Sequence, residues 1–298
     1  MKNLFLLGLL LSGVYFKANA QLTSFKDEQT EKFGFKNKAG KPVVAATYDE
    51  AGVFNEGLAP VRLQDKWGYI DSTGKIIIPV NLQYDFAGAF YEGLACVNNG
   101  GQFGVGGDWG AINKAGKLVI PMKYFQFFKF NNGIAAVKSN DSSMYGFIDK
   151  TGKTIIDFNY VDAGDFSENF AWVSVFNKEK REQEYFFISK NGRPAFDGKF
   201  AKARDFKGGI APVQIQNKWG VINAKGLTVV APAYDNMFTY AGGLAVVEKD
   251  GKYGFIDAKG KVILAMQYDF ASSFENGKAN VSLNGEEFFI NTKGEKIK

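Results

Sequence analysis

The 298-residue sequence contains no histidine and a single cysteine, Cys96. The missing histidine excludes Ser-His-Asp and Cys-His nucleophile systems and zinc sites that use imidazole ligands. One thiol cannot form a disulfide within the chain or supply a thiolate metal site. Because Cys96 lies in an apolar stretch typical of a strand, we expect it to be a small buried side chain rather than a reactive thiol. The sequence therefore predicts no cofactor, no metal site and no catalytic residue.

Excess charge is also scarce. The sequence has 36 Lys and Arg against 31 Asp and Glu, a formal net charge of +5. These charges are spread along the chain, so they do not indicate a nucleic-acid partner or an anionic lipid surface. After residue 20, no stretch approaches the roughly 20 apolar residues of a membrane-spanning helix. We therefore predict no nucleic-acid partner and no transmembrane segment in the mature chain.

The first 20 residues have the pattern of a signal peptide. Lys2 is followed by an apolar run over 4–14, and Ala18-Asn19-Ala20 is a small-residue cleavage site. The alternative is a buried N-terminal strand or helix. No cysteine follows the run, so we expect no lipoprotein anchor. We predict cleavage between Ala20 and Gln21, an exported protein in the periplasm or outside the cell, and a single domain over residues 21–298.

One motif recurs eight times along the chain. An aromatic residue, usually followed by glycine, stands seven residues before a second glycine, and successive copies are 34 to 42 residues apart. The motif begins at Phe33, Trp67, Trp109, Tyr145, Tyr185, Trp219 and Tyr253 and, in a degenerate copy, at Glu287. A period in this range is typical of a repeat architecture.

Each repeat has the pattern of a three-stranded antiparallel meander. In the second copy, residues 58–63, 67–71 and 75–79 are short apolar-rich runs separated by turn residues. Asp71 and Gly74 fit a type I turn closed by a bulge. The glycine after the aromatic residue indicates that another chain segment passes close by. Since both faces of the middle strand are apolar or empty, we expect neighbouring repeats to cover both faces.

Eight such units can stack as an open array or close as a ring. Degenerate first and last copies resemble the caps that an open array needs, and no strand is left over to close a ring. Eight is also a normal number of propeller blades, and closure hides strand edges. We predict an all-β protein of about eight three-stranded repeats in an open solenoid-like array, with a closed eight-bladed β-propeller as the alternative.

Three copies of the motif carry a resemblance to a known family. Lys-Trp-Gly-Tyr-Ile-Asp at 66–71, Lys-Trp-Gly-Val-Ile-Asn at 218–223 and Lys-Tyr-Gly-Phe-Ile-Asp at 252–257 resemble the bacterial WG (KWG) repeat. The resemblance extends over about residues 32–298. It implies an all-β repeat protein, often exported, with no common enzymatic activity. A weaker similarity links the motif to cell-wall-binding repeats that grip choline or glycan between rings. Those repeats are shorter, so none of their binding residues is carried over.

The aromatic residues of the repeats are the candidate binding residues. Rings spaced along an array can stack on sugars or grip a peptide. The alternative, which we prefer, is that most of them form the core between repeats, because they stand beside glycines in strands that are apolar on both faces. Trp172 is out of register with the motif and is the better candidate for an exposed anchor. The candidates are Trp67, Trp109, Tyr145, Trp172, Trp219 and Tyr253.

These patterns predict an exported, non-enzymatic binding or scaffold protein of the bacterial cell envelope. Its partner would be a protein or a cell-wall glycan, and its oligomeric state is not predicted. Length variation falls in one turn, at 98–108, 138–144 and 177–184, on a rim where repeat proteins often bind. The alternative, which we prefer, is that it is tolerated variation of the surface. The alternative function is a glycan hydrolase with paired carboxylates. Its candidates, Asp49, Asp85, Asp235 and Asp269, occupy equivalent repeat positions, which favours turn capping.

Overall fold

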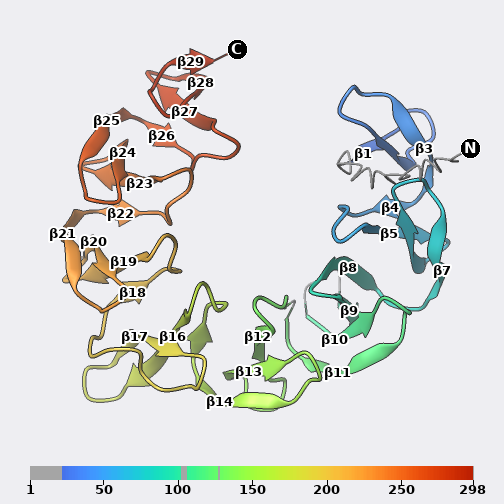
Figure 1. Cartoon of the computed structure of the whole chain (residues 1–298), viewed down its shortest axis with the longest axis horizontal. Helices are drawn as coiled ribbons and strands as arrows, with labels where there is room; N and C mark the ends of the chain where they lie inside the picture. The colour runs from blue at the N-terminus through green and yellow to red at the C-terminus, as the bar shows by residue number, and fades with distance from the viewer. Residues whose placement is uncertain (1–21, 102–105, 127, 298) are drawn as a thin grey trace, which may run out of the picture.

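The computed structural model describes residues 22–101, 106–126 and 128–297, so the predicted signal peptide lies outside the described residues. Every regular element in these ranges is a β-strand. The strands form eight antiparallel sheets, each made of three or four consecutive strands. Figure 1 shows the sheets following one another along an open arc, with β1–β3 at one end and β26–β29 at the other. The predicted open array is confirmed, and the described sheets do not close into a propeller.

We number the sheets 1 to 8 and call the three meander strands A, B and C. Five sheets have all three of these strands and, before strand A, a lead strand that the sequence did not predict. In sheets 1 and 4 the lead strand is absent, and in sheet 5 strand C is absent. The sheets are β1 (Thr23–Lys26), β2 (Phe33–Lys36) and β3 (Pro42–Tyr48); β4 (Glu50–Ala51), β5 (Leu58–Leu63), β6 (Lys66–Asp71) and β7 (Ile76–Leu82); β8 (Phe86–Tyr91), β9 (Leu94–Asn99), β10 (Asp108–Asn113) and β11 (Leu118–Tyr124); β12 (Ile134–Lys138), β13 (Tyr145–Asp149) and β14 (Thr154–Tyr160); β15 (Asp162–Ala163), β16 (Phe170–Asn177) and β17 (Glu182–Ser189); β18 (Lys202–Ala203), β19 (Ile210–Ile215), β20 (Lys218–Asn223) and β21 (Thr228–Tyr234); β22 (Asn236–Met237), β23 (Leu244–Lys249), β24 (Lys252–Asp257) and β25 (Val262–Tyr268); and β26 (Phe270–Ala271), β27 (Ala279–Leu283), β28 (Glu286–Ile290) and β29 (Lys296–Ile297).

The turn between strands B and C has the predicted chemistry. In sheet 2, Oδ1 of Asp71 accepts hydrogen bonds from the backbone N–H groups of Thr73 at 2.8 Å and Lys75 at 3.1 Å. The N–H of Gly74 donates to the carbonyl of Asp71 at 3.0 Å, and Gly74 has a φ of +87°. Only glycine adopts this conformation without strain, which explains why the second glycine of the motif is present in all eight copies.

The glycine after the aromatic residue makes room for strand C of its own sheet. In sheet 2, Trp67 pairs with Leu82 and Tyr69 with Ile78, so strand C uses four residues where strand B uses two. This bulge carries the backbone of strand C over Gly68, where an added Cβ would lie only 2.7 Å from the carbonyl oxygen of Ile78. The predicted close approach is therefore confirmed, and its cause is the bulge.

The fifth repeat shows what happens without this glycine. Phe186 stands at the equivalent position, and residues 194–200 make only isolated bridges instead of a strand C. The ends of the segment keep the usual register, with Tyr185 opposite Phe200 and Ile188 opposite Pro194. Because a side chain stands where the bulged backbone passes in other repeats, the middle of the segment is displaced. Phe196, in the middle of this segment, packs its ring against those of Phe187 and Phe206.

The apolar core lies between the sheets. Each pair of neighbouring sheets shares one cluster of buried side chains, such as Phe35 and Val44 of sheet 1 with Val61 and Ile70 of sheet 2. The same arrangement continues through all seven interfaces between the described sheets. No sheet could bury its apolar faces alone, so the stacking of repeats supplies the stability of the fold.

Candidate functional site

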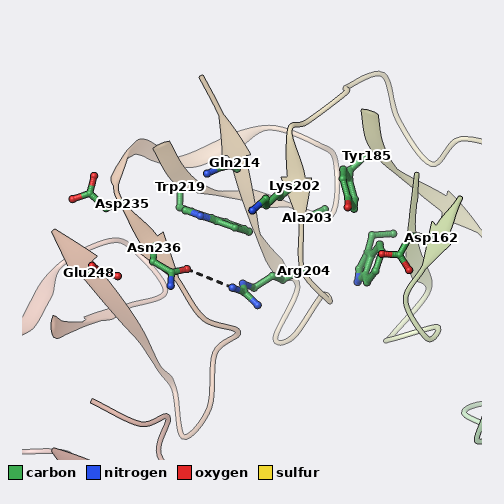
Figure 2. Close-up of a pocket in the computed structure, with 11 residues that line it drawn as sticks. Asp162, Tyr185, Lys202, Ala203, Arg204, Gln214, Trp219, Asp235, Asn236 and Glu248 are labelled. Atoms are coloured by element: carbon green, nitrogen blue, oxygen red, sulfur yellow. Dashed lines mark hydrogen bonds between the residues drawn. The ribbon is translucent and has the colours of Figure 1, made fainter. Parts of the chain in front are cut away.

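A hollow with a volume of about 530 Å³ spans sheets 5, 6 and 7. It is lined by Asp162, Trp172, Tyr185, Lys202, Ala203, Arg204, Gln214, Trp219, Asp235, Asn236 and Glu248. We call it the central pocket. Figure 2 shows Trp219 and Arg204 in its middle, with Tyr185 and Asp162 toward one end and Asp235 and Glu248 toward the other. Its volume lies in the range of small-molecule binding sites.

The lead strands explain why this part of the array differs from the rest. In sheets 2, 5, 6 and 7, the residue that follows the lead strand pairs by its backbone with the third residue of strand A. In sheet 5 this pair is Gly164 and Trp172, and in sheet 6 it is Arg204 and Pro212. Trp172 fits only because Gly164 has no side chain, since a Cβ there would lie 2.3 Å from the indole Nε1. The central pocket therefore combines a large residue of strand A in sheet 5, Trp172, with a large residue after the lead strand of sheet 6, Arg204.

Arg204 is a partly buried cation held by rings. Its guanidinium carbon lies 4.9 Å from the ring centroid of Trp219 and 5.2 Å from that of Phe238. Burial lowers the pKa of Arg204, but a guanidinium remains charged at neutral pH. Its Nε is buried without a hydrogen-bond partner in the described residues, and one terminal nitrogen lies 3.5 Å from Oδ1 of Asn236. The cation is thus oriented by the rings and keeps hydrogen-bonding capacity for a ligand.

Trp172 and Tyr185 form the aromatic wall of the central pocket. Their ring centroids lie 5.8 Å apart, and both side chains are half-buried. The indole Nε1 of Trp172 donates to Oδ1 of Asp205 at 2.8 Å. Burial raises the pKa values of Asp205 and of Asp162 above their usual range. The pocket therefore offers ring faces beside carboxylates, amides and cations, a combination that can bind an uncharged polar ligand.

The predicted aromatic residues other than Trp172 are divided between the core and the hollows, and Trp219 belongs both to the core and to the lining of the central pocket. Trp67, Trp109 and Trp219 are 3%, 1% and 4% exposed and belong to inter-sheet clusters, as the preferred interpretation states. Trp67 also borders an apolar hollow of about 280 Å³ between sheets 2 and 3. Tyr145 borders a more polar hollow of about 350 Å³ and donates a hydrogen bond from its hydroxyl to Oε1 of Gln126 at 2.9 Å. Tyr253 packs against Phe270 of sheet 8 at 6.2 Å between centroids. Their binding role stays a prediction.

Several polar residues of the central pocket were missed by the sequence reasoning. Arg204 stands where sheets 2, 3 and 5 have Gly52, Gly88 and Gly164, and sheet 7 has Phe238 at this position. An alignment of the repeats on one another therefore singles out both large residues, as it does Trp172. Lys202 and Gln214 face each other in the register of β18 and β19. This pair belongs to no sequence motif. Only the stacking of the three sheets shows that Lys202 and Gln214 line one pocket with residues of sheets 5 and 7.

The four candidate carboxylates bind turns. The N–H of Gln64 donates to Oδ2 of Asp49 at 2.8 Å, and Lys32 of the preceding sheet forms an ion pair with the same carboxylate. Asp235 and Asp269 repeat this arrangement, and Asp85 accepts from the N–H of Gly100 at 2.6 Å. The lysine hydrogen bonds hold the pKa values of Asp49, Asp235 and Asp269 below their usual range, opposite to the shift of a general acid. These contacts explain the four aspartates as residues that cap A–B turns. Three of them also link that turn to a lysine of the preceding sheet.

Cys96 is 5% exposed, and its thiol donates to the carbonyl of Phe128 at 2.7 Å. Burial raises the pKa of Cys96, which disfavours the reactive thiolate. Within residues 22–101, 106–126 and 128–297, no group of three or more Cys, Asp or Glu side chains is placed to hold a metal ion, and no helix has the length and apolarity to span a membrane.

The insertion at 177–184 is fixed to the array by one carboxylate. Glu184 is 4% exposed and accepts hydrogen bonds from Lys180 at 2.8 Å, Lys199 at 2.6 Å and Asn177 at 2.9 Å. Lys180 and Lys199 border a second hollow of about 350 Å³, which shares Gln214 with the central pocket. The insertion at 177–184, in the A–B turn of sheet 5, is thus held in place beside the central pocket.

Glu184 should make the protein sensitive to acid. The lysine hydrogen bonds lower its pKa to about 2 from an unfolded value near 4.5, so its contribution to stability is complete above about pH 4.5 and is lost as the pH falls toward 2. We expect Glu184→Gln to be less stable than wild type at pH 7 and to lose less stability between pH 5 and 2.5. Urea unfolding across this range measures both effects. The exposed Glu182→Gln is the control, and an unchanged acid slope in Glu184→Gln would contradict the assignment.

The fold and the pockets between its sheets define an all-β tandem-repeat protein. The chain belongs to the WG-repeat family, because the family described as WG containing repeat matches residues 33–67, 67–103, 109–141, 145–178, 185–219, 219–253 and 253–286. The sequence resemblance is thereby confirmed. No curated protein matches the chain.

Three solved structures illustrate the breadth of structural similarity. A crystal structure of the eukaryotic initiation factor has a TM-score of 0.49 and 11% identity, covering 94% of this chain and 95% of its own. PorZ, a surface component of the type-IX secretion system of Porphyromonas gingivalis, has a TM-score of 0.38 and 8% identity, over 84% of this chain and 37% of its own. Hsv2 of Kluyveromyces lactis has a TM-score of 0.42 and 12% identity, over 80% and 70%. Similarity at this level leaves the function open.

Proposed function

We propose that this protein is an exported, non-enzymatic binding module of the bacterial cell envelope, and that the central pocket binds a cell-wall glycan. The observation that carries the proposal is the lining of the pocket. Trp172 and Tyr185 offer ring faces for the apolar side of a sugar, while Lys202, Gln214 and Glu248 offer donors and acceptors for its hydroxyl groups. The second hollow shares Gln214 with the pocket, and we expect a ligand of more than one sugar unit to extend into it.

Export is supported by the pattern of residues 1–20, and the absence of histidine supports a role without catalysis. Mass spectrometry of the protein recovered from envelope and culture fractions tests export. We expect a chain that begins at Gln21. A cytoplasmic chain that keeps Met1 would contradict this part of the proposal.

Glycan binding can be followed by tryptophan fluorescence, because two of the four tryptophans line the central pocket. We expect soluble fragments of cell-wall glycan to change the emission in a saturable way. Combining Lys202→Ala with Gln214→Ala should weaken binding at least about tenfold, since a hydrogen bond contributes roughly 1 kcal/mol or more. Isothermal titration calorimetry measures the same affinities independently of fluorescence.

The matched control combines Lys190→Ala with Gln29→Ala, which removes the same residue types from exposed positions elsewhere. It should bind like wild type. The proposal fails if no glycan fragment binds, or if the pocket variant and the control bind equally. Specific capture of an envelope protein that the pocket variant no longer captures would replace the glycan with a peptide as the ligand.

A further inference from the structure

The net charge of +5 conceals a separation of charge between the two ends of the strands. We define the turn rim as the B–C turns and the first residues of strand C, at 37–43, 71–77, 113–119, 149–155, 189–195, 223–229, 257–263 and 291–295. Its cations, all exposed, are Lys38, Lys41, Lys75, Lys114, Lys117, Lys150, Lys153, Lys190, Arg193, Lys225, Lys259, Lys261 and Lys293. The rim has four acids, so its net charge is +9 and the rest of the chain is net negative.

One repeated contact places these turns on the same rim. A Cβ added to Gly116 would lie 2.9 Å from Ile78 of the preceding sheet, and Gly260 stands in the same relation to Val230. Each B–C turn thus rests against strand C of the sheet before it. Repetition of this contact carries the cations along the whole arc of Figure 1.

All but one of the cations of the turn rim lack an ion pair, whereas several lysines at the opposite ends of the strands are paired. Of the rim cations, Lys114 alone forms an ion pair among the described residues, with Glu56. By contrast, Lys218 and Lys252, which begin strand B, each pair with an aspartate of the next sheet. The aspartates of the rim are used as turn caps, as Asp71 is. The rim therefore presents a positive potential that its own acids neutralise only in part.

Aliphatic side chains are exposed on the same rim. They follow the turn glycine by one to three residues and are between 38% and 60% exposed. They are Val43, Ile76, Ile77, Leu118, Ile155, Leu227, Val229, Val262 and Ile263. A soluble polyanion would need only the cations. Exposed aliphatic groups interleaved with unpaired cations match an anionic lipid surface, where charge attracts the protein and apolar groups enter the headgroup boundary.

We propose that the turn rim binds the surface of an anionic lipid bilayer. Lysine and arginine residues of consecutive turns contact lipid headgroups, and the aliphatic residues of strand C enter the interface. The central pocket is lined by Gln214 and Glu248, near the opposite ends of the strands, so it remains open to a ligand when the rim is bound.

The test uses the protein recovered from the exporting cell and sedimentation with vesicles of phosphatidylcholine alone or with 30 mol% phosphatidylglycerol. We expect binding to the anionic vesicles only, weakening as salt is raised. A charge variant combines Lys117→Gln, Lys153→Gln and Arg193→Gln in three consecutive sheets. It should bind at least tenfold more weakly, because each cation near such a surface contributes to the affinity.

The control for charge combines Lys66→Gln, Lys178→Gln and Lys249→Gln, which removes three exposed lysines from the other ends of the strands. It has the same net charge as the charge variant and should bind like wild type. A second variant combines Ile77→Thr, Val229→Thr and Ile263→Thr, which keeps β-branched residues on the strands. This threonine variant should lose the vesicle binding that persists at high salt, because salt screens the charges but not the apolar contacts. Circular dichroism establishes that each variant is folded.

Three results would overturn the proposal. The first is equal binding to neutral and anionic vesicles, and the second is equal loss in the charge variant and its control. The third is that the wild-type protein does not bind the anionic vesicles. If the charge variant then also aggregates, the lysines only protect the exposed strand edges from pairing. Binding to soluble dextran sulfate that survives the threonine substitutions, without binding to vesicles, would assign the rim to a soluble polyanion instead.

Discussion

Replacing Gly220 with valine is expected to destabilise the protein by about 3 kcal/mol, one of the largest effects of a single substitution in this chain. A Cβ at this position would lie 2.6 Å from the carbonyl oxygen of Val230 and 2.9 Å from the backbone nitrogen of Pro232. Both atoms belong to the bulged backbone of β21, which cannot move aside as a flexible side chain can. The valine must therefore displace strand C of sheet 6.

The fifth repeat indicates the form that this damage would take. Phe186 occupies the equivalent position there, and the following segment forms no strand C. In sheet 5, however, phenylalanine rings fill the space, whereas sheet 6 has Val230 and Pro232 on a regular strand. We expect Gly220→Val to lose strand C without this compensation.

Urea unfolding measures the effect of Gly220→Val, and hydrogen exchange of β21 locates it. The control is Ala224→Val, which makes a similar change four residues away in the exposed B–C turn of the same sheet and should alter stability by less than about 0.5 kcal/mol. A change below about 0.5 kcal/mol in Gly220→Val would show that the glycine is not packed against strand C.

Replacing Phe206 with alanine should destabilise the protein by about 3 to 5 kcal/mol. Phe206 is fully buried, and its ring centroid lies 4.8 Å from those of Phe170 and Phe187 and 6.4 Å from that of Phe196. This cluster replaces the missing strand C between sheets 5 and 6. Since Phe206 contacts three other rings, its removal leaves a cavity between them that can be closed only by repacking the whole cluster.

Phe176→Ala is the matched control for Phe206→Ala, because Phe176 is 55% exposed in the same region. Its removal should change the free energy of unfolding by less than about 0.5 kcal/mol. Denaturant unfolding of both variants provides the comparison. Equal losses in the two variants would mean that the phenylalanine cluster does not hold sheets 5 and 6 together. Near-ultraviolet circular dichroism should also change in Phe206→Ala alone, because only that variant loses packed rings.

Much of the fold follows from short-range rules that a sequence displays directly. Asp71 and Gly74 specify a turn because a side-chain oxygen and a left-handed glycine act within five residues. The alternation of Trp67, Gly68 and Tyr69 specifies a strand that is covered on both faces, and the fixed period specifies stacking. These features were predicted, and the structure confirms the open array that they favour.

The site was predicted only in part. Trp172 was singled out because it breaks the register of the repeat, and it does line the central pocket. Arg204 lies after the lead strand, outside the motif, and its backbone partner Pro212 follows the ordinary pattern of strand A, so the motif does not point to it. Tyr145 and Trp67 were placed in one row with Trp109, yet they border hollows of different polarity. The character of each hollow depends on the lead strand of the next sheet, which the sequence did not reveal as a strand.

The sequence by itself determined the all-β class, the eight repeats, the chemistry of their turns and the absence of histidine and disulfide chemistry. The tertiary structure decided which residues of different repeats meet. It placed Arg204 between Trp219 and Phe238, and it gathered the turn cations on one rim although the net charge is small. The physical reason is that stacking repeats the same contact from sheet to sheet. Equivalent residues about 34 to 42 positions apart therefore become neighbours, and their charges and rings act together.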